Sequence, residues 1–113
     1  MLASKNKLSL YISGPMRGYP HNNRDAFQKA HKLWAKNPMI GLICNPSHED
    51  DIHDIDPDVP LTQEQLKECM HRDLELLFDC SAIYMLRGWE RSEGAKVEHS
   101  LAVYLKLLVI YES

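Results

Sequence analysis

The sequence predicts one α/β domain over residues 1–113, with a four-stranded parallel sheet of order 2-1-3-4 in a small three-layer, flavodoxin-like or Rossmann-like arrangement. Three observations lead to this fold class. Short β-prone runs alternate with segments of helical period, and such alternation gives a parallel sheet with helices on both faces. A chain of 113 residues is long enough for one domain. Right-handed crossovers in so small a sheet favour the order 2-1-3-4.

The predicted elements follow one another without a repeat or a low-complexity tract. They are, in order, a strand over residues 8–13, a helix from Asn22 or Asn23 to Asn37, a strand over 39–44, a polar loop over 46–60, a helix from Thr62 to about Asp79, a strand over 81–86, a loop over 87–91, a helix from Ser92 to near Lys106 and a strand over 107–111.

Local signals justify these boundaries. Gly14 and the proline after it end the first strand, and the first helix ends at Asn37 because a residue before proline avoids the α region. Residues 46–60 carry acids, histidines and three prolines without periodicity, which predicts a loop. Ligands of such sheets bind beyond the carboxyl ends of the strands. We therefore expect one crevice, surrounded by the loops that start at Ser13, Cys44 and Arg87.

Composition excludes several classes of protein. The chain has 13 Lys and Arg against 16 Asp and Glu, and a net charge of −3 argues against a protein that coats a nucleic-acid polymer. No apolar run approaches the roughly 18 residues of a membrane span, and no charged-then-apolar leader opens the chain. The three cysteines form no Cys-x-x-Cys pair. We expect reduced thiols in a cytoplasmic protein without membrane partners.

Two carboxylates lie on helix faces that the pattern otherwise fills with apolar side chains. Asp73 lies on the stripe of the second helix, which comprises Leu66, Met70, Leu74, Leu77 and Phe78. Glu98 lies on a face of the third helix, with Gly94, Leu101, Ala102 and Leu105. Burial of an unpaired carboxylate is costly or raises its pKa. Two carboxylates at one cleft can break a glycosidic bond, one as nucleophile and one as acid. The alternative is a helix phase shifted by one residue, with both acids in solvent.

The loop after the first strand and the start of the third helix both suit an anion. Arg17 offers a guanidinium, and backbone N–H groups can come from Gly14, Met16 and Gly18. Ser92 caps the third helix and Gly94 leaves its first turn open, so the N–H groups there suit a phosphate or a carboxylate. Glycine-rich turns and serine caps are also common for structural reasons alone. The loop is neither a P-loop nor a dinucleotide fingerprint.

Three segments together resemble the nucleoside 2-deoxyribosyltransferase superfamily. They are Tyr11-Ile12-Ser13-Gly14-Pro15-Met16-Arg17-Gly18, Arg72-Asp73-Leu74 and Ser92-Glu93-Gly94-Ala95-Lys96-Val97-Glu98. The segment Gly88-Trp89-Glu90-Arg91-Ser92 is typical of an uncharacterised branch of phages and bacteria, the domain of unknown function 4406. The resemblance covers residues 8 to about 110.

The resemblance implies N-glycosidic bond cleavage or (deoxy)ribosyl transfer. Glu98 matches the nucleophile, Asp73 the acid that protonates the leaving base, and Tyr11 the tyrosine that orients the nucleophile. Transferases of the superfamily have an aspartate at the position of Ser92. The nucleoside 5′-monophosphate N-hydrolase branch has a serine there that holds the 5′-phosphate, and an arginine that matches Arg17. The resemblance therefore favours a 5′-phosphorylated nucleotide as substrate, with no cofactor and no metal.

Two departures from the resemblance keep other functions open. The hydrolase branch has a serine where this chain has Pro15, and many relatives continue past the last strand to lend a residue to a neighbouring subunit. A nucleotide-binding or sensing module of phage origin, without catalysis, is therefore the main alternative to an enzyme. A structural building block is a third hypothesis, but it does not explain two inward-facing acids.

Several other side chains have expected places. The acidic segment with His48 and His53 fits no zinc spacing, so we expect a solvated lid rather than a metal site. This lid and Asn45 are expected near the base. Trp89 suits stacking on a base or packing on a partner subunit equally well. An apolar end of the third helix favours a homodimer or a higher homo-oligomer, through Leu101, Val103, Tyr104, Leu107 and Leu108.

Overall fold

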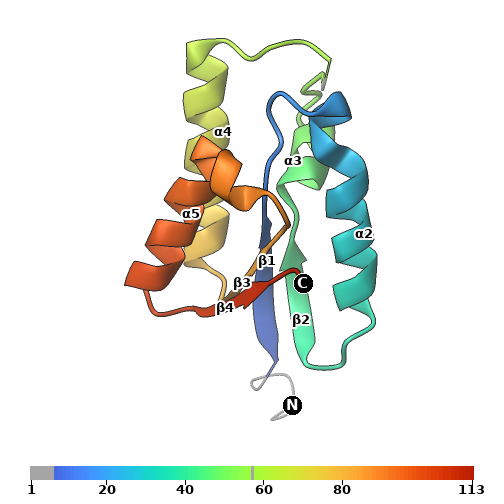
Figure 1. The fold of residues 1–113 in the computed structure, drawn as a ribbon, viewed down its shortest axis with the longest axis vertical. Helices are drawn as coiled ribbons and strands as arrows, with labels where there is room; N and C mark the ends of the chain where they lie inside the picture. Colours follow the sequence, from blue (N-terminus) through green and yellow to red (C-terminus); the bar gives the residue numbers. More distant parts are fainter. Residues whose placement is uncertain (1–6, 57) are drawn as a thin grey trace.

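The computed structural model describes residues 7–56 and 58–113; residues 1–6 of the predicted domain lie outside this part. A four-stranded parallel sheet of order β2-β1-β3-β4 forms its centre, which confirms the predicted order (Figure 1). The strands are β1 (Leu8–Ser13), β2 (Ile40–Cys44), β3 (Ala82–Met85) and β4 (Leu108–Tyr111). The helices are α2 (Arg24–Ala35), α3 (Pro46–Ile52), α4 (Gln63–Phe78) and α5 (Glu93–Tyr104), with short 3₁₀ helices η1 (Pro20–Asn23) and η2 (Trp89–Arg91).

The alternation of side chains along β1 divides the core into two layers. Leu10 and Ile12 pack with Phe27 of α2 on one face of the sheet. Tyr11 points to the other face, where it packs in a cluster with Leu77 of α4 and residues of α5. Successive side chains of a strand point to opposite faces, so the residue two positions after Tyr11 also faces α4 and α5.

The buried stripes of α4 and α5 differ in detail from those that the apolar pattern predicted. Leu66 and Phe78 are exposed, because the helix turns a different set of side chains inward. The buried residues are Cys69, Asp73 and Leu77 in α4 and Ala95, Glu98 and Ala102 in α5. Both acids therefore lie on the buried stripes, and the alternative that places them in solvent is wrong.

Helix α3 corrects the prediction of a loop over residues 46–60. The Asn45 side chain accepts hydrogen bonds from the backbone N–H groups of Ser47 (3.0 Å) and His48 (3.4 Å), and Pro46 occupies the first helical position. An asparagine cap followed by proline is a strong start for a helix. The buried positions of α3 include the polar residues Ser47 and Asp50. A search for apolar periodicity therefore cannot find this helix.

The start of α2 corrects a second prediction. Asn23 occupies the cap position in a left-handed conformation (φ 60°), but its side chain makes no capping hydrogen bond. Its Nδ2 atom instead donates to the carbonyl oxygen of Pro15, at 2.9 Å. Asn23 thus fixes the loop after β1, and neither Asn22 nor Asn23 caps the helix through its side chain.

The apolar surface at the end of α5 bears on self-association. Val103, Tyr104 and Leu108 are exposed, whereas Leu101 and Leu107 are partly buried against the core. A homo-oligomer through this surface stays a prediction. Within residues 7–56 and 58–113, no helix has the length and apolar character that a bilayer crossing needs.

Gly14 gives a test of the close approach between the ends of β1 and β3. A Cβ atom at Gly14 would lie 2.6 Å from the Cβ atom of Leu86, so the two segments would have to separate. We expect Gly14→Ala to lower the free energy of unfolding by about 1–3 kcal/mol, measured by urea denaturation. Gly41→Ala is the matched control, because its new Cβ would meet nothing closer than the Cβ atom of Lys7, at 3.3 Å. Equal losses in the two variants would contradict this account.

Candidate functional site

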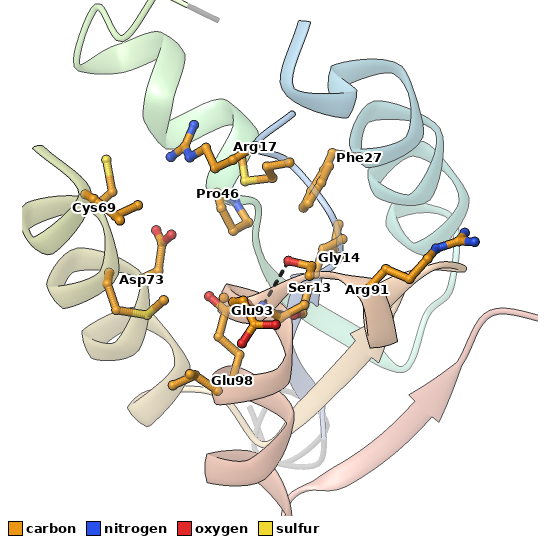
Figure 2. A pocket seen from close by; sticks show the side chains of 18 residues that line it. Ser13, Gly14, Arg17, Phe27, Pro46, Cys69, Asp73, Arg91, Glu93 and Glu98 are labelled. Carbon is orange, nitrogen blue, oxygen red and sulfur yellow. Dashed lines mark hydrogen bonds between the residues drawn. The ribbon is translucent and has the colours of Figure 1, made fainter. Parts of the chain in front are cut away.

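A pocket of about 480 Å³ opens at the carboxyl ends of β1, β2 and β3, where the strand order predicted a crevice (Figure 2). Much of its wall is apolar and includes Ile12, Phe27, Met70, Ala95 and Val97. The polar side chains that line it include Ser13, Arg17, Asp73, Ser92 and Glu98. A mainly apolar pocket with a few convergent polar groups is the usual form of a small-molecule site.

Two hydroxyl groups of β1 hold the carboxylate of Glu98. The Tyr11 hydroxyl donates to Oε2 at 2.7 Å, and the Ser13 hydroxyl donates to Oε1 at 2.6 Å. Tyr11 and Ser13 are two positions apart on one strand and so share a face. Glu98 is only 6% exposed. The carboxylate is therefore fixed at both oxygens and faces the pocket from α5.

Burial dominates the proton affinity of Glu98. Desolvation raises its pKa to about 7, the two hydroxyl donors oppose this rise, and the charge of Asp73 adds to it. Burial also raises the pKa of Tyr11 well above its ordinary value, so the phenol keeps its proton and remains a donor. Glu98 therefore changes its charge near neutral pH, although a free glutamate would be ionised there.

Asp73 lines the same pocket from α4 (Figure 2). Its Oδ1 atom accepts hydrogen bonds from Nε (2.9 Å) and Nη2 (2.7 Å) of Arg72. Burial raises the pKa of Asp73 to about 6, and the guanidinium beside it limits the rise. The structure thus brings together two carboxyl groups from different helices, one beside neutral hydroxyls and one beside a cation.

A third buried acid links Asp73 to the loop after β1. Asp50 of α3 is 4% exposed and forms ion pairs with Arg72 (2.8 Å) and Arg17 (3.1 Å). The Arg17 contact uses one guanidinium nitrogen, Nη1, and the side chain stays partly exposed at the pocket. Helix α3 is therefore fixed to α4 and to the loop by charge.

The start of α5 completes the wall. The Ser92 hydroxyl oxygen accepts a hydrogen bond from the N–H of Ala95 at 3.2 Å, which confirms the predicted cap. The first N–H groups of a helix have no partner within it. Ser92 and Gly94 lie in the same pocket as Gly14, Met16 and Arg17. The two predicted anion-binding segments therefore meet at one cavity.

Three residues that were predicted to contact the substrate do not line this pocket. Trp89 stacks on His99 with ring centroids 4.2 Å apart, and it does not line the pocket. The Asn45 side chain accepts the hydrogen bonds that cap α3, and its Nδ2 atom lies 3.2 Å from Nδ1 of His31. Gly18 lines a neighbouring cavity of about 620 Å³, to which Arg17 also contributes.

Sequence reasoning missed three residues of the site: Ser13, Asp50 and Arg72. Strand alternation could have found Ser13, because it shares a face with Tyr11. No apolar pattern could have found Asp50, since it belongs to the helix that was predicted as a loop. Arg72 precedes Asp73 in sequence, but the pattern gave no sign that its guanidinium turns back to this neighbour.

Metal binding has no support from the geometry of the described part of the chain. There, no three histidine, cysteine, aspartate or glutamate side chains gather as a metal ion would require. His53 contacts the carbonyl oxygen of Glu49 through Nδ1 at 2.8 Å.

Comparisons with known proteins give one match. Residues 8–111 match the family model described as "Domain of unknown function (DUF4406)". Neither the curated proteins nor the solved structures contain a match to the chain.

The buried charge of Glu98 gives a pH-dependent stability. Because its folded pKa is raised from 4.5 to about 7, the folded protein binds a proton that the unfolded chain has released over this range. Stability from this group is therefore present below pH 4.5 and is lost as the pH rises through 7. We expect Glu98→Gln to gain roughly 3 kcal/mol relative to the parent protein between pH 4.5 and 8, measured by denaturant unfolding at each pH. A difference that does not change with pH would contradict the burial of this charge.

Proposed function

The chain belongs to the family of the domain of unknown function DUF4406, and we propose that it cleaves the N-glycosidic bond of a nucleotide or nucleoside. One observation carries this proposal. The Glu98 carboxylate is held at both oxygens inside a pocket that a second carboxyl group, Asp73, also lines. The motifs that resemble the nucleoside 2-deoxyribosyltransferase superfamily contain these two acids and Tyr11, which supports the same chemistry.

In the proposed reaction an oxygen of Glu98 attacks the anomeric carbon of the sugar. The new C–O bond replaces the C–N bond to the base, and the bond electrons leave with the base nitrogen, which takes a proton from Asp73. Water then attacks the anomeric carbon and gives a proton to Asp73, which frees Glu98. A second base could replace water and would yield transfer instead of hydrolysis.

The cationic rim of the pocket supports a 5′-phosphorylated substrate. Arg17 keeps guanidinium donors beyond the Nη1 atom that contacts Asp50, and arginine binds phosphate with several donors at once. The open start of α5 at Ser92 and Gly94 adds helix N–H groups to the same cavity. A nucleoside 5′-monophosphate would match both the anion-binding rim and the pair of acids.

Binding without turnover is the second candidate function. The observation that favours it is that both oxygens of Glu98 already accept a hydrogen bond from the protein. Such a carboxylate could serve as a fixed acceptor for a sugar hydroxyl in a nucleotide sensor. The two functions are separated by incubating the protein with a panel of deoxynucleoside monophosphates and measuring the free base by chromatography.

We expect Glu98→Gln to reduce base release at least about 10³-fold, because an amide cannot form the glycosyl ester. Asp73→Asn is expected to reduce it by about 10²–10⁴-fold, since the base would then leave without its proton. His71→Ala is the control, because this side chain is exposed on α4. Unchanged base release in Glu98→Gln, with the fold intact by circular dichroism, would refute the mechanism.

The pH profile gives a second test of these roles. The productive form needs Glu98 ionised and Asp73 protonated, although their pKa values are about 7 and about 6. We therefore expect a narrow bell-shaped kcat/KM profile with its maximum between pH 6 and 7. In Asp73→Asn the alkaline limb is expected to disappear. The acidic limb is expected to move to higher pH, because in the parent it follows the first proton lost from the pair, whereas in the variant it follows Glu98 alone, the group with the higher pKa. An acidic limb that moves to lower pH would contradict this assignment.

A further inference from the structure

A chain of charged side chains leads from the rim of the pocket to Asp73. Nη1 of Arg17 lies 3.1 Å from Oδ2 of Asp50, and Nη2 of Arg72 lies 2.8 Å from Oδ1 of the same carboxylate. That Nη2 atom also lies 2.7 Å from Oδ1 of Asp73. Asp50 and Asp73 are both buried, so solvent and salt screen these contacts little.

One nitrogen of Arg72 is thus shared between two carboxylates, which makes the contacts interdependent. Asp50 divides its charge between Arg17 and Arg72. An anion that binds Arg17 weakens its pairing with Asp50, and Asp50 then attracts Nη2 of Arg72 more strongly. Asp73 loses part of that contact and keeps the one to Nε, at 2.9 Å. A carboxylate with less contact to a cation holds its proton more firmly.

We propose that Asp50 and Arg72 are positioning residues that couple an anion bound at Arg17 to protonation of Asp73. The role of Asp73 as the acid rests on the proposed function. A substrate phosphate at Arg17 would then prepare the proton that its own leaving base requires. Neither Asp50 nor Arg72 needs to touch the reacting atoms, because both act through Asp73.

The charges around Asp73 agree in sign with this coupling. Burial raises its pKa most, the charges of Arg72 and Arg17 lower it, and the charge of Asp50 raises it. Neutralising Arg17 with an anion therefore raises the pKa of Asp73 directly as well as through the chain. The charged side chains of Arg91 and Glu93 also line the pocket, at the start of α5. The other titratable groups that interact with Asp73 come from α4, β1 and α5: Cys69, Tyr11 and Glu98.

Only one of these three groups titrates near neutral pH. The pKa values of Cys69 and Tyr11 are raised by burial, so both stay neutral there. Glu98 is removed as a titrating group by the Glu98→Gln substitution, in which turnover is also expected to be lost. The proton affinity of Asp73 can then be measured by itself.

The experiment follows the carboxyl carbon of Asp73 by NMR in Glu98→Gln, with Asp73→Asn to assign the signal. Titrations are recorded with inorganic phosphate and with chloride at the same ionic strength. We expect phosphate to raise the pKa of Asp73 by about one unit, a tenfold gain in proton affinity. Adding Asp50→Asn should remove most of this effect, because the amide carries no charge to redistribute. Asp51→Asn is the matched control on α3, since Asp51 pairs with Arg24 instead.

Two further variants separate coupling from a merely structural role. Without phosphate, Arg72→Gln is expected to raise the pKa of Asp73, whereas Asp50→Asn is expected to lower it. Arg72→Lys keeps the charge and should restore a value close to that of the parent. If Arg72 and Asp50 contributed only packing, their substitution would not shift the pKa of Asp73 in opposite directions.

The coupling is wrong if phosphate leaves the titration of Asp73 unchanged, or if Asp50→Asn keeps the full phosphate effect. It is also wrong if Arg72→Gln and Asp50→Asn shift the pKa of Asp73 in the same direction. These titrations need no turnover. The proposed function is judged separately by base release, so a failure of one is distinguishable from a failure of the other.

Discussion

The hydrogen bonds between β1 and Glu98 are the contacts on which the site depends. A buried carboxylate without partners would cost several kcal/mol or stay protonated well above neutral pH. The hydroxyls of Tyr11 and Ser13 each contribute a charge-assisted hydrogen bond, worth about 1.5–3 kcal/mol. They offset part of the desolvation, and the pKa of Glu98 stops at about 7. The fold thus holds the acid where a change of charge near neutral pH is possible.

Asp73 is stabilised in a different way, and the contrast distinguishes the two acids. Its partner is the guanidinium of Arg72, which would bring the pKa of an exposed aspartate below its ordinary value. Burial outweighs that effect and leaves the pKa at about 6. Asp73 therefore remains within reach of protonation because burial outweighs the effect of Arg72, and the charge of Asp50, which shares that arginine, adds to the rise. An arginine that paired with Asp73 alone would lower the pKa of that carboxyl further and favour its charged form.

The order of strands and the two inward acids followed from patterns in the sequence, and the resemblance implied Tyr11 as a partner of Glu98. The other partners, Ser13, Asp50 and Arg72, were not predicted. Alternation of strands and helices fixes a parallel sheet, and an acid on an apolar stripe is visible without coordinates. Helix α3 was not predicted, because its seven residues give barely two turns and its buried side carries the polar residues Ser47 and Asp50. The contact of Arg72 could not be predicted, because the direction in which a long side chain turns depends on its tertiary neighbours. Trp89 was expected to stack on a base or to pack on a partner subunit, whereas in the structure its ring stacks on His99 of the same chain.

The parallel topology explains why residues so far apart in sequence act on one cavity. Parallel strands end at the same edge of the sheet, so the segments after β1, β2 and β3 must emerge side by side. Arg17, Asp50 and Ser92 come from these three segments, and α4 and α5 add one acid each. Charge at Arg17 can therefore reach Asp73 over three ion pairs, although 56 positions of chain separate them (73 minus 17). The proposed coupling between an anion at Arg17 and the proton affinity of Asp73 therefore needs no movement of the sheet.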